Sequence, residues 1–313
     1  MKSLLVASAH GGTGKTTLVC QFAHHLRLVR RCRVLVIDLA EPASSAMSLT
    51  RGAGTHWMKG WAPNARSSRL AETNLPSIGV LAANAMAGIA YRDDPIGARC
   101  YANLRHVLRQ FAPLFDVCLI DSPPWPDSRA ICAAALADAL VSPVLLWPDA
   151  LSRIVDFING SNSVRSVRAR LNPSLRLIGL IPNCVEPTSR QQTQLKSFEA
   201  SMGAWLVSPA PNPGAALLMP RLDAMSQAQA DGVPVAALVD GDLAAYCAWQ
   251  ALSACFDGLA RQLDSMGESQ HESARESARE SAGESMCESM CESTCDAAGE
   301  AALQPKSVEA CHA

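Results

Sequence analysis

Short, largely apolar runs recur between Leu4 and Ile181, at intervals that leave room for a helix between them. Several of them are apolar at every position rather than at alternate positions, which is typical of strands covered by helices on both faces. The pattern therefore predicts an α/β fold with a mainly parallel, doubly wound sheet. We expect strands at Leu4–Ala7, Val34–Ile37, Ile78–Leu81, Val117–Ile120, Ala139–Val144 and Leu175–Ile181.

The segments between these runs carry apolar residues at helical spacing. Leu18, Phe22 and Leu26 are four residues apart and predict an amphipathic helix directly after the first strand. The connection Pro42–Pro76 shows little periodicity, and we expect an insertion that contains a helix. Further helices are predicted at Tyr101–Phe111, Ser152–Leu171, Ser189–Met202 and Leu243–Leu263.

The composition changes abruptly after Ser265, where a four-residue repeat ending in Glu-Ser begins. Few residues of this repeat can contribute to a core, so we expect a disordered or transiently helical tail. The chain is thus predicted to form a folded domain, residues 1–264, followed by an acidic low-complexity tail, residues 265–313. Cys287, Cys291 and Cys295 are spaced like ligands on one helix face, but the repeat itself produces this spacing, which argues against a metal site.

The composition is that of a globular protein, because 49% of the 313 residues are hydrophobic and 18% are charged. The net charge of −2 conceals an uneven distribution. After Ser265 there are ten acidic and three basic residues, a net charge of −7, which leaves +5 on the rest of the chain. This excess is mildly favourable for an anionic partner.

The sequence also bears on the cellular compartment. Leu4–Ala7 is too short for a signal peptide, and no apolar run approaches the roughly 18 residues of a membrane span. We therefore expect a cytoplasmic protein that does not bind a membrane. Eight cysteines scattered through apolar segments are interpreted as small core residues in a reducing compartment. They are Cys20, Cys32, Cys100, Cys118, Cys132, Cys184, Cys247 and Cys255.

Three glycines and a lysine lie between the first predicted strand and the first predicted helix, in the segment Ala9–Thr17. Glycine lets the backbone turn tightly, so that successive N–H groups point at one phosphate. Lys15 adds a point charge, Thr16 a hydroxyl for Mg²⁺, and the helix the positive end of its dipole. The segment has Ala9 in place of a glycine but otherwise fits a phosphate-binding loop, which predicts binding of a nucleoside triphosphate. The expected contacts are Gly11, Gly12, Thr13, Gly14, Lys15, Thr16 and Thr17.

Two other predicted strands end in an acid. Asp121 is followed by Ser-Pro-Pro, which stops the strand at the sheet edge where ligands bind. Because an unpaired acid is costly there, Asp121 is the candidate that holds Mg²⁺ through water, with a turn cap as the alternative. Asp38 ends the second strand and is expected to orient the attacking water or the Mg²⁺ shell, or else only to cap the following turn.

Together these motifs resemble the ParA/MinD family of P-loop ATPases, which have a deviant Walker A motif. The resemblance spans about residues 1–262, and the order and spacing of its parts make it specific. It rests on His10–Thr17, Ile37–Asp38 with Pro42, Phe115–Pro124, Ala137–Val144, Asn172–Gly179 and Asp231–Val235.

The resemblance implies a homodimer that closes around two ATP molecules, hydrolyses them slowly, and binds and releases a surface. In ParA-like members this surface is nonspecific DNA, and a small DNA-binding or adaptor partner stimulates hydrolysis. Lys15 would contact the β- and γ-phosphates, while Thr16 and Asp121 would serve Mg²⁺. Asp38 would lie near the water, which makes Lys15, Asp38 and Asp121 the catalytic candidates. Asn183 is placed like the asparagine that reads adenine in such proteins, although asparagine after a strand is also common in turns.

The chain departs from the family pattern at two positions. The signature lysine, which reaches the phosphates of the partner subunit, falls on His10. A histidine is mostly neutral at pH 7 unless a phosphate raises its pKa. The second acid of the Asp-x-Asp-Pro stretch becomes Ala40, or Glu41 if one residue is inserted before Pro42. Since that position commonly governs hydrolysis in the family, the sequence supports ATP binding more strongly than turnover.

Three functions stay open at this point. A ParA-like ATPase would segregate or position plasmid or chromosome DNA, or another large cargo, on the nucleoid. Its candidate DNA-binding residues are Arg165, Arg168 and Arg170, for which a solvated helix face is the alternative. A MinD-like regulator of a surface machine, such as cellulose synthesis, secretion or a flagellum, usually ends in a basic amphipathic helix, whereas this tail is acidic. A hydrolysis-poor, nucleotide-dependent scaffold would fit His10 and Ala40.

Overall fold

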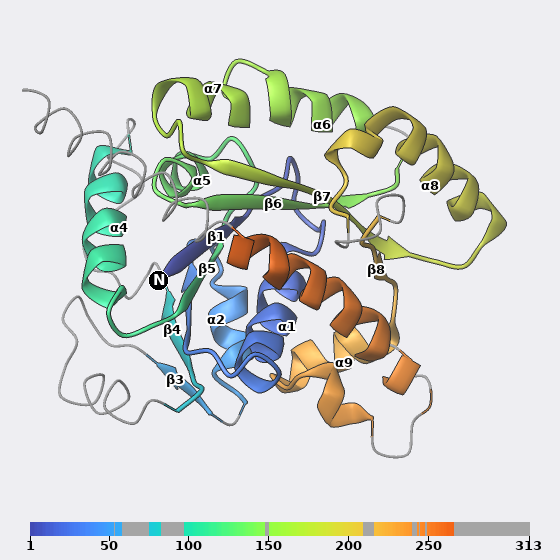
Figure 1. The fold of residues 1–313 in the computed structure, drawn as a ribbon, viewed down its shortest axis with the longest axis horizontal. Helices are drawn as coiled ribbons and strands as arrows, with labels where there is room; N and C mark the ends of the chain where they lie inside the picture. Colours follow the sequence, from blue (N-terminus) through green and yellow to red (C-terminus); the bar gives the residue numbers. More distant parts are fainter. Residues whose placement is uncertain are drawn as a thin grey trace, which may run out of the picture. The chain divides into compact units, whose positions relative to one another are not determined.

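The computed structural model describes residues 1–52, 54–57, 75–82, 97–147, 150–208, 216–239, 243, 245–247 and 249–265. The described residues up to Leu263 belong to one compact unit, built on a sheet of eight strands that pair in parallel (Figure 1). The strands are β1 Lys2–Val6, β2 Val34–Asp38, β3 Thr55–Trp57, β4 Ile78–Ala82, β5 Val117–Asp121, β6 Ala139–Leu145, β7 Arg176–Val185 and β8 Met219–Pro220. Their order across the sheet is β3-β4-β2-β5-β1-β6-β7-β8. The predicted α/β fold with a parallel sheet is confirmed.

Helices cover both faces of this sheet (Figure 1). One face carries α4 Ala98–Phe111, α5 Ser128–Ala134, α6 Ala150–Asn159 and α7 Val164–Arg170, whose apolar residues share one core with the strands. The other face carries α1 Lys15–Leu28, α2 Ser44–Leu49 and α9 Asp223–Asp231. α8 Ser189–Met202 follows β7, two short 3₁₀ turns cover Gly203–Trp205 and Val235–Leu238, and residues 249–265 are helical.

The core explains why the apolar runs are continuous. Leu5, Leu35 and Ile120 are fully buried towards α4 and α6, in the same core as Leu104 and Phe157. The intervening residues of the same strands are fully buried as well, so each strand is covered on both faces. On the α1 side, the rings of Phe22 and Phe256 lie 5.5 Å apart and join α1 to the helix at 249–265.

The register of the central strands sets the position of the two predicted acids. Val6, Asp121 and Asp38 are paired in register across β1, β5 and β2. All three lie at the carboxyl ends of parallel strands, where α/β sheets bind their ligands. Asp38 and Asp121 are therefore neighbours, although 83 positions separate them in the sequence.

The single helix predicted at Ser152–Leu171 is wrong, because the chain forms two helices there, α6 and α7. The break falls on Gly160–Ser163, a run of residues that favour turns. Ser163 then begins α7 as its N-cap, with its hydroxyl accepting a hydrogen bond from the Ser166 N–H at 3.2 Å.

Two further expectations need correction. β7 extends to Val185, so Asn183 lies within the strand, paired with Met219 of β8, and not after its end. Cys184 and Cys247 are exposed rather than buried, and Cys32 is half-buried. Cys184 has a positive φ of 55° at the irregular pairing between β7 and β8, which turns its side chain away from the core. The other five of these cysteines are buried as predicted.

The insertion predicted at Pro42–Pro76 contains a helix, α2, and the short strand β3. The acidic tail, with Cys287, Cys291 and Cys295, lies outside the described residues. Among the described helices, none has the length and apolar character that a membrane crossing would require.

Candidate nucleotide-binding site

The predicted phosphate-binding loop joins β1 to α1 and has the backbone that its glycines permit. Gly12 and Gly14 have φ values of 74° and 93°, in the left-handed region that side chains with a Cβ rarely adopt. A Cβ at Gly14 would also collide with Nδ2 of Asn183. Glycine is therefore required at position 14 for both conformation and space.

The side chain of Lys15 folds back over this loop. Its Nζ donates to the carbonyl oxygen of His10 at 2.9 Å and to the hydroxyl of Ser8 at 3.1 Å. Lys15 is buried, and this burial lowers the pKa of its ammonium group. A desolvated ammonium held inside the loop is placed to meet a phosphate.

Thr16 and Asp121 meet directly beneath the loop. The Thr16 hydroxyl donates to Oδ2 of Asp121 at 2.8 Å. Asp121 is fully buried, and burial followed by the nearby charge of Asp38 raises its pKa to about 7. Among the described residues, no group donates to the buried Oδ1 of Asp121.

This pair fits the donor set that Mg²⁺ requires. Mg²⁺ binds oxygen ligands in octahedral geometry and usually keeps several waters. The Thr16 hydroxyl is one such ligand, and the unpartnered Oδ1 of Asp121 is a free acceptor for a metal-bound water. The residues present therefore fit Mg²⁺ bound together with a triphosphate. The ion would supply positive charge next to the phosphates.

Both oxygens of Asp38 are engaged by the segment that follows β2. Oδ1 accepts from the N–H of Ala40 at 3.0 Å, while Oδ2 accepts from the hydroxyl of Ser45 at 2.7 Å and the N–H of Ala46 at 3.0 Å. Ala43, the N-cap residue of α2, has only a methyl side chain and cannot accept a hydrogen bond from the helix. The carboxylate of Asp38 caps α2 instead. The capping alternative is thus realised, and the proposed action of Asp38 on water stays a prediction.

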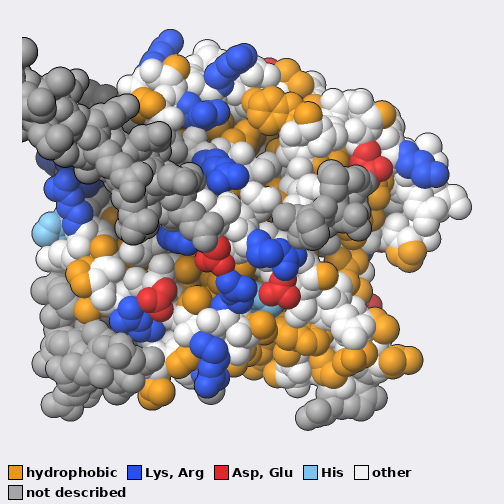
Figure 2. All heavy atoms as spheres, in the orientation of Figure 1, with side chains coloured by type: hydrophobic (Ala, Val, Ile, Leu, Met, Phe, Trp, Pro, Cys, Tyr) orange, Lys and Arg blue, Asp and Glu red, His pale blue; other side chains and the backbone are white. Residues whose placement is uncertain are grey.

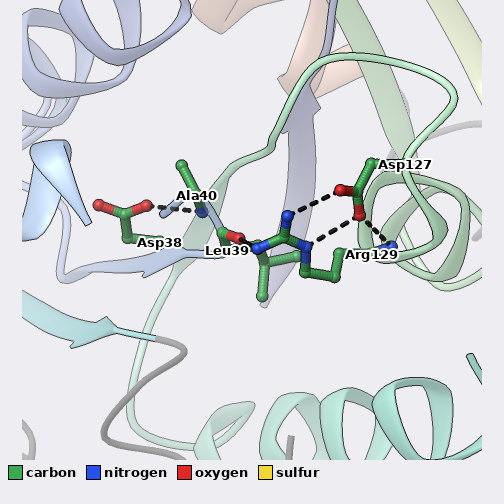
Figure 3. Close-up of polar contacts among 5 residues, drawn as sticks. All are labelled: Asp38, Leu39, Ala40, Asp127 and Arg129. Atoms are coloured by element: carbon green, nitrogen blue, oxygen red, sulfur yellow. Dashed lines mark hydrogen bonds and ion pairs between the residues drawn. The ribbon is translucent and has the colours of Figure 1, made fainter. Parts of the chain in front are cut away.

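A contact that the sequence did not indicate ties the same segment to the start of α5. The guanidinium of Arg129 donates to both oxygens of Asp127, at 2.8 and 2.7 Å, and to the carbonyl oxygen of Leu39 at 3.0 Å (Figure 3). Asp127 also accepts from the N–H of Arg129, as the N-cap of α5. The only indication in the sequence is the pattern Asp-x-Arg at the start of a helix. This pattern does not indicate a contact with Leu39.

Two of the expected nucleotide contacts have other partners. Nδ2 of Asn183 donates to the carbonyl oxygen of Thr13 at 2.7 Å, so β7 supports the loop from the side. The Thr17 hydroxyl donates to Oε1 of Gln229 at 2.6 Å and joins α1 to α9. Adenine recognition by Asn183 and nucleotide contact by Thr17 therefore stay predictions.

His10 lies at the outer side of the loop, next to α6. Its Nδ1 lies 3.3 Å from Nη1 of Arg153, and because a guanidinium only donates, the imidazole accepts there. Burial first, then the charges of Arg153 and Lys15, lower the pKa of His10. This shift favours the neutral imidazole, and the contact brings a permanent cation next to His10.

The strand, loop, helix and paired acids occur in the order that one family of nucleotide-binding domains uses. Residues 4–235 match the CobQ/CobB/MinD/ParA nucleotide-binding domain. The chain belongs to this family. The resemblance to the ParA/MinD ATPases is thereby confirmed, and the match covers all candidate residues of the site.

The chain is also similar to known members of the CobQ/CobB/MinD/ParA family. It is 28% identical to the protein IncC of Escherichia coli over 197 residues, which cover 59% of this chain and 51% of that protein. It is 27% identical to the chromosome-partitioning ATPase Soj of Thermus thermophilus over 213 residues, 67% of this chain and 81% of Soj. The chain thus spans about half the length of IncC.

Solved structures of family members share the fold. An ATP complex of a variant of McdA from Cyanothece superposes with a TM-score of 0.60 at 18% identity, covering 84% of this chain and 96% of McdA. MinD in the MinC:MinD complex of Aquifex aeolicus gives a TM-score of 0.58 at 14% identity, covering 83% and 96%. Cobyrinic acid a,c-diamide synthase from Mycobacterium smegmatis, with bound ADP and magnesium, gives 0.52 at 19%, covering 74% and 89%.

Proposed function

We propose that this protein is a ParA-like ATPase, a nucleotide switch that forms a homodimer on ATP and partitions or positions plasmid or chromosome DNA, or another large cargo, through nonspecific DNA binding. It works in the cytoplasm, on nucleoid DNA, and a small DNA-binding or adaptor partner stimulates its slow hydrolysis. The observation that carries the nucleotide part is the Thr16–Asp121 hydrogen bond beneath a glycine loop that already encloses the Lys15 ammonium.

Hydrolysis is the more demanding part of this proposal. Asp121 and Thr16 supply the oxygen ligands for Mg²⁺, and Lys15 supplies charge for the phosphates. Asp38 is the candidate for orienting water, but it also caps α2, so a water would share its carboxylate with two N–H groups and a hydroxyl. Such a shared carboxylate fits slow turnover.

The arginines of α7 support the DNA part. Arg165, Arg168 and Arg170 lie on this short helix, and in Figure 2 Lys and Arg side chains are seen at the top of the view, over α7. Residues 150–175 contain a single acid, Asp156, against four arginines, so this surface is positively charged. Contacts to phosphates need charge and reach but no reading of bases.

The test is binding of the full chain to nonspecific duplex DNA with ATP, with ADP and without nucleotide, at two salt concentrations. We expect binding that requires ATP and weakens steeply with salt. Changing Arg165, Arg168 and Arg170 together to Ala should make binding less dependent on salt. The slope of the logarithm of the binding constant against the logarithm of the salt concentration should become shallower by about 0.9 for each DNA phosphate that the variant no longer neutralises. The matched control is Arg105→Ala with Arg109→Ala, two arginines on α4.

ATP binding without DNA binding would overturn the partition role. The hydrolysis-poor scaffold or the surface-machine regulator would then be the better account, because both need nucleotide binding but no contact with DNA.

A further inference from the structure

Arg153 is a cation in a place where the fold does little to stabilise it. It lies in the first turn of α6, Ala150–Asn159, where the helix dipole disfavours positive charge. Its side chain is exposed, and in the part of the chain that the structure describes no carboxylate forms an ion pair with it. Among the described residues, its guanidinium Nη1 lies 3.3 Å from Nδ1 of the His10 ring.

This contact brings Arg153 to the phosphate-binding loop. Lys15 donates to the carbonyl oxygen of the same residue, His10, at 2.9 Å. Two cations thus approach one loop residue, one from inside the loop and one from α6. The positive end of α1 points into the same loop, and positive charge gathered in this way favours an anion.

Arg153 lines two cavities. A cavity of about 280 Å³ lies against the carboxyl end of β6, and a second of about 340 Å³ lies against the loop after β5. Four residues line both cavities, namely Ala9, His10, Arg153 and Phe157. Arg153 therefore has room to reorient towards a ligand at the mouth of the loop.

We infer that Arg153 is a phosphate-contacting residue whose guanidinium, positioned by His10, supplies fixed positive charge to the terminal phosphate of bound ATP. It thereby provides the charge that the family resemblance assigns to a lysine at position 10. A guanidinium suits this role because its planar fork binds two phosphate oxygens at once. The inference rests on the proposed function in one respect, since the loop has to bind ATP.

The terminal phosphate can belong to the nucleotide of the same subunit or to that of a second copy, and the experiment separates the two. The affinities for ADP and for a non-hydrolysable ATP analogue are measured for the wild type and for Arg153→Ala, together with dimer formation by analytical ultracentrifugation. We expect Arg153→Ala to leave ADP affinity unchanged and to reduce the preference for the triphosphate about tenfold. A contact within one subunit predicts this loss in dilute, monomeric protein, whereas a contact with the second copy predicts it only where dimers form.

Rescue distinguishes a phosphate contact from a structural role. His10→Lys in the Arg153→Ala background should restore most of the preference for the triphosphate, because it returns a cation to the same place. Arg105→Ala, on α4, is the control. If Arg153→Ala behaves like this control, or if the lysine brings no rescue, the inference is wrong.

The outcomes also separate this inference from the proposed function. A wild-type chain that binds ATP but not DNA contradicts the partition role and leaves the Arg153 result valid. A wild-type chain that binds no ATP contradicts both.

Discussion

The hydroxyl of Thr16 donates a 2.8 Å hydrogen bond to Oδ2 of Asp121, and the second carboxylate oxygen of Asp121 is buried without a donor among the described residues. A buried acid with one unused oxygen is costly in the absence of a ligand. The arrangement therefore has two effects. It lowers the stability of the ligand-free protein, and it keeps one carboxylate oxygen available to a ligand.

Asp121→Asn separates these two effects. The neutral amide removes the buried charge, so the midpoint of thermal unfolding without ligand should stay equal or rise. The stabilisation by Mg²⁺ and ATP should disappear, which for a wild-type chain at 100 times its dissociation constant is about 2.7 kcal/mol. A variant that still gains the full wild-type stabilisation from Mg²⁺ and ATP would show that Asp121 does not serve the metal.

Lys15→Ala should weaken ATP binding by about 100-fold, because the variant removes a desolvated ammonium from within the loop. Charge-assisted hydrogen bonds of this kind contribute roughly 1.5–3 kcal/mol each. Titration calorimetry measures the affinity, and Lys196→Ala, an exposed lysine on α8, is the matched control. Tight ATP binding by Lys15→Ala would contradict the assignment of the loop.

Arg129→Met should lower the free energy of unfolding by about 2 kcal/mol, because it removes a charged donor from the Leu39 carbonyl and from Asp127. Arg33 forms a comparable fork with Asp116, at 2.7 and 3.2 Å, but this pair is more exposed. Arg33→Met should therefore cost no more than about 1 kcal/mol. Urea unfolding compares the two variants, and equal losses would show that the Leu39 contact contributes nothing of its own.

His24 should make the protein less stable as the pH falls. Burial, followed by the charge of Arg27, lowers the pKa of His24 to about 4, while an unfolded chain titrates near its ordinary value of 6.5. Between pH 6.5 and about 4, the unfolded chain therefore binds a proton at His24 that the native protein does not bind. Stability is therefore complete above pH 6.5 and is lost progressively as the pH falls towards 4.

The loss assigned to His24 is about 2 kcal/mol at pH 5, relative to about pH 7.5. This contribution is isolated by comparing the urea unfolding of the wild type and of His24→Gln at both pH values. Asp121, whose pKa is raised, works in the opposite direction but is present in both proteins. A variant that loses as much stability as the wild type would exclude His24 as the cause.

Much of the fold could be predicted because its determinants are local. The six predicted strands all exist, since buried parallel strands require continuous apolar runs. β3 and β8 were missed because strands of three and two residues are too short to show a periodic pattern. α6 and α7 were predicted as one helix because the turn between them is short. The loop and its acids were found because each stands at the end of a strand.

The contacts that organise the site could not be predicted in the same way. Arg129 meets Leu39 across 90 positions, and Arg153 meets His10 across 143. Such pairs depend on the order of strands in the sheet, which no local pattern of this chain encodes. The sequence indicated that Asp38 ends a strand and offered capping of the next turn as one alternative. For the same reason it did not show that α2 and the turn before it use both oxygens of Asp38.

The hydrogen bond from Asn183 to the Thr13 carbonyl has a consequence for the energetics of ligand capture. A glycine-rich loop loses much conformational entropy when it is fixed in one shape. Here β7 fixes that shape through Asn183, so the loss accompanies folding and does not recur when a phosphate arrives. The loop is therefore preorganised, and more of the interaction with the phosphate is expressed as affinity.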